Sequence, residues 1–205
     1  KNNLPVSRSI LSQQIYIDEM LSSDEKIINE PFSYIDNIKV DNNLFSFDTI
    51  SKFPVVNNSN DFDFLDISSD KKLYNTSIKL AEDYFILNSS KEKLFLNYKP
   101  KYLDIRFFLS SNFTDQTING VSTEYTWLNG IICYKENAKN DDYFEINFNF
   151  SNTNYPENNK IDCSFKKKYD FNNLIIFPAF LNYNIEGNKG NGIRLLSINY
   201  IGFEK

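Results

Sequence analysis

The chain has 205 residues, a formal net charge of −5 and an aromatic content of 16%, with 19 Phe and 13 Tyr. This length allows one domain with a hydrophobic core, or a domain with an arm, and the aromatic content excludes a disordered chain. Apart from the run Lys166–Lys168, the basic residues are scattered, and this scatter argues against the clustered positive charge of a nucleic-acid-binding protein. No apolar run is long enough for a transmembrane helix.

The first thirty residues predict an N-terminal arm. Within residues 8–29, apolar residues recur with helical spacing at Ile10, Leu11, Ile15 and Leu21, and Ser7 or Ser9 can cap the start of the helix. We expect this amphipathic helix either to cover the sheet of the main domain or to dock on a neighbouring chain.

The next seventy residues carry short apolar runs broken by Asn and Asp. The runs at residues 53–56 and 62–67 alternate between apolar and polar residues, which is typical of half-buried strands. Residues 77–87 contain Ile78, Ala81, Tyr84 and Phe85 at helical spacing and predict a short helix.

The second half of the chain predicts a series of strands. Residues 143–150 show the clearest alternation, because Phe144, Ile146, Phe148 and Phe150 point one way and polar residues point the other. Further strands are expected at residues 102–109, 127–134, 160–169, 174–178 and 194–203. Many strands at short spacing with few helices indicate an all-β, mostly antiparallel fold, a sandwich or jelly roll, over a single domain from residue 31 to 205.

The two cysteines and the acidic pairs indicate no metal site. Cys133 and Cys163 form no zinc-binding motif, and we favour buried free thiols over a cross-strand disulfide. Two groups of acidic residues could form a calcium site: Asp61, Asp63 and Asp66, and Asp141 and Asp142. We favour the simpler interpretation that they lie on a solvated strand face.

The chain contains no histidine, which restricts the chemistry that it can perform. A serine or cysteine nucleophile of the usual kind needs a histidine base. Lysine bases or paired carboxylates remain open as the basis of an atypical enzyme. Trp127 and neighbouring tyrosines could stack on a sugar, although one tryptophan in a strand is more often part of the core.

Two segments carry a resemblance to a known family. The sequence FPAFLNYNIEGNKGNGIRLLSINY at residues 177–200 resembles the closing strands of the small 2-oxoglutarate and Fe(II)-dependent oxygenases, including their phage-encoded and marine-bacterial branch. The sequence WLNGIICY at residues 127–134 resembles an earlier strand of that family. The resemblance covers about the last hundred residues and implies a double-stranded β-helix, which is a form of jelly roll.

The resemblance also implies that the iron site is lost. It aligns the first two iron ligands near Val121 and Thr123, close to Glu124, and the distal histidine at Tyr183, so no ligand set for ferrous iron remains. It aligns Arg194 with the arginine that binds the 2-oxoglutarate carboxylate. We therefore expect Tyr183 to fill the former metal position, and Arg194 either to be a vestige of cosubstrate binding or to pair with a nearby carboxylate.

These inferences predict a non-catalytic structural or interaction module without metal or cofactor. The resemblance and the compositional bias favour a subunit of a larger protein assembly, such as a phage or other virus particle, with no nucleic-acid partner. A homo-oligomer is the simplest such assembly. The alternatives are a β-sandwich module that binds carbohydrate or another small ligand, and an enzyme that does not depend on histidine.

Overall fold

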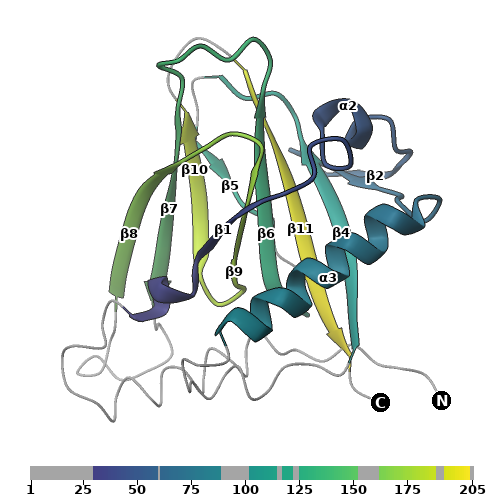
Figure 1. Cartoon of the computed structure of the whole chain (residues 1–205). Helices are drawn as coiled ribbons and strands as arrows, with labels where there is room; N and C mark the ends of the chain where they lie inside the picture. Colours follow the sequence, from purple (N-terminus) through teal and green to yellow (C-terminus); the bar gives the residue numbers. More distant parts are fainter. Residues whose placement is uncertain are drawn as a thin grey trace.

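The computed structural model describes residues 30–59, 61–88, 102–114, 117–121, 125–151, 162–187 and 192–203. The predicted helix at residues 8–29 lies outside these residues. Two antiparallel sheets make up the fold (Figure 1). In the described part of the chain, no helix is both long and apolar enough to cross a membrane.

The larger sheet has seven strands, in the order β1-β9-β6-β11-β4-β3-β2. Its strands are β1 (Asp36–Lys39), β2 (Val55–Ser59), β3 (Phe62–Leu65), β4 (Tyr102–Ser110), β6 (Thr126–Lys135), β9 (Asn173–Pro178) and β11 (Ile193–Phe203). The smaller sheet has the order β5-β10-β7-β8, formed by β5 (Ile118–Asn119), β7 (Phe144–Ser151), β8 (Asp162–Tyr169) and β10 (Asn182–Gly187).

The eight strands from β4 to β11 pair in a nested manner. The first pairs with the last, β4 with β11, and then β5 with β10, β6 with β9 and β7 with β8, always antiparallel. The chain thus behaves as one long hairpin that is wound so that its pairs fall alternately in the two sheets. This arrangement is a jelly roll, and it confirms the predicted fold class.

The strand predictions of the second half are confirmed within one or two residues, and the reason is burial. In β7, Phe144, Ile146, Phe148 and Phe150 are fully buried between the sheets. In β6 all residues from Thr126 to Tyr134 are buried, because this strand lies between β9 and β11 and both of its faces are covered. The strands β5 and β10 were not predicted as separate strands, because β5 has only two residues and the alternation of β10 is short.

One long helix packs across the larger sheet. Helix α3 (Lys71–Asn88) extends the predicted helix by more than a turn at its start, where the Asp70 carboxylate accepts a hydrogen bond from the Leu73 amide at 2.9 Å. The helix crosses the outer face of the sheet (Figure 1). Its Tyr84 hydroxyl donates to the carbonyl oxygen of Tyr34 at 2.8 Å, which fixes the preceding 3-10 turn η2 (Glu30–Tyr34) against it.

Aromatic rings join the two sheets. Phe148 of β7 meets Phe177 of β9 edge to face, with 4.9 Å between ring centroids, and Phe150 meets Phe180 in the same way at 5.7 Å. Such pairs contribute about 0.5–1.5 kcal/mol each beyond the area that they bury. The abundant phenylalanine therefore serves the core between the sheets.

Candidate functional site

Tyr183 lies between the two sheets, where the resemblance had aligned a metal ligand. It belongs to β10 and is 7% exposed. Its ring meets Phe177 edge to face at 5.1 Å and lies flat against Gly120, where any Cβ would overlap the ring. The Tyr183 ring can therefore take this position only because residue 120 is a glycine, since the ring occupies the space that a Cβ there would need.

The hydroxyl of Tyr183 takes part in a short hydrogen-bond chain. It lies 3.3 Å from the Ser197 Oγ on β11, and the same Oγ donates to the carbonyl oxygen of Val121 at 3.3 Å. Burial raises the pKa of Tyr183 to about 12, although its hydrogen bonds to Ser197 and Val121 oppose that rise. The hydroxyl is therefore neutral at physiological pH.

The other ionisable group at this place is the Cys133 thiol. Cys133 lies on β6, is buried and free, and burial raises the pKa of its thiol well above the usual range. Cys163, also free, lies partly buried on the outermost strand of the smaller sheet. The prediction of free thiols is confirmed, and Cys133 is held in its unreactive neutral form.

The residues at this place do not fit ferrous iron. Val121 and Tyr183 offer no ligand of the required type, while Thr123 and Glu124 lie outside the described residues. Within the described ranges, no group of three or more His, Cys, Asp or Glu side chains could hold a metal ion. The chain as a whole has no histidine to complete a facial set of ligands.

The structure does not bring Arg194 and Tyr183 together. On β11, Ser197 faces the smaller sheet and contacts Tyr183, and side chains three apart in a regular strand point to opposite faces. Arg194 therefore lies on the outer face of the larger sheet and does not reach the interior.

Arg194 makes two contacts on this outer face. Its guanidinium donates to the carbonyl oxygen of Ser110 at 3.3 Å and lies over the ring of Phe47, 5.6 Å from the centroid. No ion pair joins it to a carboxylate of the described residues. The alternative prediction, an arginine paired with an acidic residue, is therefore not met there.

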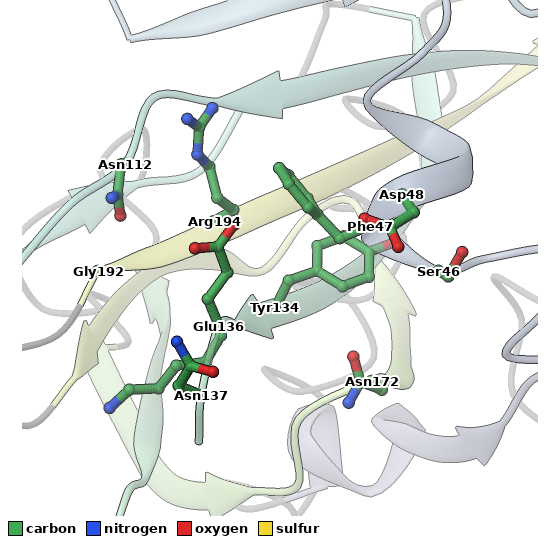
Figure 2. A pocket seen from close by; sticks show the side chains of 11 residues that line it. Ser46, Phe47, Asp48, Asn112, Tyr134, Glu136, Asn137, Asn172, Gly192 and Arg194 are labelled. Carbon is green, nitrogen blue, oxygen red and sulfur yellow. The ribbon is translucent and has the colours of Figure 1, made fainter. Parts of the chain in front are cut away.

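Arg194 helps to line an open cavity of about 500 Å³, which we call the outer pocket. Figure 2 shows that helix α2 (Phe47–Ile50) forms one wall, with Phe47 beside Tyr134, and that Arg194 and Asn112 come from the opposite side. The pocket is lined by Ser46, Phe47, Asp48, Asn112, Tyr134, Lys135, Glu136, Asn137, Asn172, Gly192 and Arg194.

Two backbone features shape the outer pocket. Asn137 and Asn172 have positive φ angles of 52° and 65°, and they are the only residues other than glycine with this geometry in the described ranges. Asparagine tolerates the left-handed region, and such residues gather at functional sites more often than elsewhere. Gly192 has no Cβ, which leaves room for the Asn112 amide.

Beside the outer pocket lies a buried ion pair. The Lys135 Nζ lies 2.8 Å from the Asp142 Oδ1, and their side chains are 0% and 5% exposed. The other Asp142 oxygen accepts a hydrogen bond from the Lys139 amide at 2.7 Å. Asp142, one of the acidic residues considered for calcium, thus has a structural role.

The remaining sequence candidates do not form a site. Asp66 accepts a hydrogen bond from the Ser68 amide in a turn, which together with the Ser68 side chain lowers the pKa of its carboxyl, while Asp61 lies in a turn and Asp63 in β3. Trp127 is 2% exposed, so it belongs to the core and offers no face to a sugar. The outer-pocket asparagines were missed, because asparagine is so frequent in this chain that it gave no signal.

A smaller cavity of about 230 Å³, which we call the inner pocket, opens at the end of the barrel beside Tyr183. It is lined by Asn119, Gly120, Asn129, Ala179, Leu181, Asn182 and Tyr183. This cavity and the outer pocket lie on opposite faces of the larger sheet.

Comparisons with known proteins give one finding. No protein-family model and no curated protein matches the sequence. Among solved structures, the crystal structure of a Pseudomonas putida prolyl-4-hydroxylase, which is a 2-oxoglutarate and Fe(II)-dependent oxygenase, is similar to this chain with a TM-score of 0.44 and 6% sequence identity. The similarity covers 93% of this chain and 98% of that one. The jelly-roll assignment rests on the strand pairing described above.

Proposed function

We propose that this chain is a non-catalytic structural and interaction module, a subunit of a larger protein assembly such as a phage or virus particle. The observation that carries the proposal is the Tyr183 ring packed against Gly120, at the place where the chemistry of an oxygenase-like barrel would occur. The ring takes the space of a reacting group and supplies only a neutral hydroxyl.

The ionisable groups beside the Tyr183 ring support the same conclusion. General acid–base and nucleophilic catalysis need a group whose pKa lies near the working pH. Burial instead moves the pKa values of the Tyr183 hydroxyl and the Cys133 thiol away from neutrality. Neither group can exchange a proton readily with a substrate at pH 7.

Two of the four edge strands, β8 and β2, differ in a way that supports an assembly. The edge strand β8 carries Lys166, Lys167 and Lys168, and lysines on an edge discourage pairing with another chain. The edge strand β2 of the larger sheet has the sequence VVNNS, without charge, and exposes Val55 by 48% and Val56 by 58%. We propose that β2 pairs with β2 of a second copy, since antiparallel pairing of identical strands is compatible with twofold symmetry.

The catalytic half of the proposal is tested by turnover. The purified chain is incubated with Fe(II), ascorbate and 2-oxoglutarate, and succinate is measured. We expect no succinate above the level of a protein-free control, and iron-dependent release above that level contradicts the proposal.

The assembly half is tested by sedimentation velocity over a wide range of concentrations. We expect an oligomer in the unchanged protein and a shift toward the monomer in Val56→Lys, because a charge on the edge opposes strand pairing. The matched control is Leu87→Lys, which places the same charge on another exposed apolar position, on α3, and should leave the oligomer intact. A monomer at every concentration overturns this half.

A second candidate function is the binding of a small ligand in the outer pocket. It is favoured by the Arg194 guanidinium, whose bond to Ser110 uses only one of its five N–H donors among the described residues, and by the two left-handed asparagines in the wall. A cavity of this size falls in the range of about 300–1,000 Å³ that is usual for small-molecule sites. Arg194→Gln should abolish the binding of a carboxylate-bearing ligand such as acetate or glutamate, as measured by NMR titration, and equal binding by the variant excludes this candidate.

A further inference from the structure

The inner pocket contains buried amide groups that lack hydrogen-bond partners. Asn129 on β6 is 0% exposed, and neither its Nδ2 nor its Oδ1 has a partner among the described residues. Asn199, which lies directly opposite on β11, is also 0% exposed, and its Nδ2 lacks a partner within the same ranges. Buried polar groups in folded proteins are nearly always hydrogen-bonded, so each such atom calls for an explanation.

These amides face the space between the sheets. Asn129 lines the inner pocket, and its neighbours in register are Asn199 and Phe177, the latter in ring contact with Tyr183. The Asn199 Oδ1 lies 3.5 Å from the Ser197 Oγ, which connects it to the hydrogen-bond chain of Tyr183. The unpartnered donors and acceptor therefore lie beside one cavity rather than being scattered through the core.

The wall of the inner pocket is electrically neutral. Its described lining consists of three asparagine amides, one tyrosine and small or apolar residues, and none of these side chains carries a charge. Arg194, which the resemblance aligned with the cosubstrate arginine, lies on the other face of the sheet. A carboxylate or phosphate would lose its hydration here without an opposite charge to replace it, so an anionic ligand such as 2-oxoglutarate does not fit.

A neutral ligand with several hydroxyl groups fits these features. Neither atom of the Asn129 amide is open to solvent, so a ligand reaches them only when neighbouring side chains move. Adjacent hydroxyls can then donate to the Asn129 Oδ1 and accept from its Nδ2, whereas further hydroxyls reach the amides of Asn119 and Asn182 at the exposed mouth. The Leu181 and Ala179 side chains offer an apolar wall to the C–H groups of a ring. At about 230 Å³, the cavity is below the range for drug-sized ligands and suits a single ring.

We propose that the inner pocket binds a monosaccharide-sized polyol, held by the Asn129 amide, in place of the metal and cosubstrate of an oxygenase-like barrel. The ligand is either a free sugar or the terminal residue of a glycan that enters through the mouth. This proposal does not depend on the assembly role, since a non-catalytic module can carry a ligand whatever its oligomeric state.

Binding is tested by saturation-transfer NMR on the full chain with glucose, galactose and mannose as separate probes, and with 2-oxoglutarate as the anionic control. We expect saturation transfer to at least one sugar, none to 2-oxoglutarate, and backbone shift changes at residues 119–120, 129 and 179–183. The methyl glycoside of the binding sugar then separates the two sources: retained binding indicates a glycan terminus, and lost binding indicates a free sugar. No transfer to any of the three sugars overturns the proposal.

The role of Asn129 is tested with Asn129→Leu, which removes the amide at similar volume. We expect binding to weaken by at least about tenfold, while resistance to urea stays equal or rises, because an unpartnered buried amide is removed. The matched control Asn37→Leu makes the same change at an exposed position of β1 and should bind as the unchanged protein does. Equal affinity in Asn129→Leu overturns the proposal. If that variant does not fold, the shift changes of the unchanged protein decide instead, and changes that lie away from the inner pocket overturn the proposal.

Discussion

The two faces of the larger sheet are formed by the same strands but differ in charge and in exposure to solvent. On the inner face, Ser197 and Asn129 join Tyr183 in a closed, neutral environment. On the outer face, Arg194 and Glu136 line an open pocket with charged walls. Because side chains alternate along a strand, a shift of one residue moves a group from one environment to the other. An arginine close in sequence to the barrel interior is therefore no evidence of an anion site there.

The largest difference between the faces should appear in the core. Phe177→Ala removes a fully buried ring that contacts both Phe148 and Tyr183, and we expect a loss of about 3–5 kcal/mol in the free energy of unfolding. Phe47→Ala removes a half-buried ring of the outer pocket and should lower that free energy by less than about 2 kcal/mol. Urea denaturation measures both, and equal losses contradict the distinction between a packed inner face and an open outer one.

The buried ion pair beside the outer pocket should come next. Asp142→Asn leaves the Lys135 ammonium buried without its counter-charge, and we expect a loss of about 3 kcal/mol in the free energy of unfolding. The neighbouring change Asp141→Asn alters the net charge equally but affects an exposed side chain, and it should stay within about 0.5 kcal/mol. Similar effects of the two variants would show that the pair contributes nothing specific.

The inner face should also respond to alkaline pH. The pKa of Tyr183 is about 12 in the folded chain and about 10 when unfolded, so the stabilisation from its neutral hydroxyl is complete below pH 10. It is lost as the pH rises from 10 to 12, because the unfolded state releases the proton first. Tyr183→Phe should reduce this loss by up to about 2 kcal/mol. The remainder comes from the other tyrosines whose pKa values burial raises, which are Tyr74, Tyr84, Tyr134, Tyr169 and Tyr200. An identical pH dependence of urea denaturation in the variant contradicts the assignment.

The smallest effect concerns reactivity rather than stability. We expect a thiol reagent at pH 8 to modify Cys163 in the folded protein and to leave Cys133 untouched until denaturant is added, because burial keeps the Cys133 thiol protonated. Cys163→Ser should abolish the reaction of the folded protein, and Cys133→Ser should leave it unchanged. Rapid native modification of Cys133 would show that the interior is open.

The sequence predicted those parts of the fold that depend on local alternation. The buried phenylalanines of β7 repeat every second residue, and this pattern alone identified the strand. The strands β5 and β10 give a weaker signal: β5 has only two residues, and the alternation of β10, with Tyr183 and Ile185 buried between asparagines, is short.

The sites were harder to predict for a physical reason. The resemblance aligned Tyr183 and Arg194 with one site, but it could not show on which face of its strand each side chain lies, because a shift of one residue moves a side chain to the other face. The outer pocket combines α2, the end of β6, the turn before β9 and the start of β11. Only the nested pairing brings these distant segments together, and no local motif records it.

The nested pairing also constrains the order in which the molecule can form during synthesis. Strand β11 inserts between β4 and β6, so these two earlier strands cannot be joined into a continuous sheet until the end of the described chain has left the ribosome. Until then their unpaired edges are open to other strands, and contacts between residues so far apart in sequence form slowly. The protein is therefore exposed to misassembly for the time that the ribosome needs to translate the 82 residues between β4 and β11, and then β11 itself.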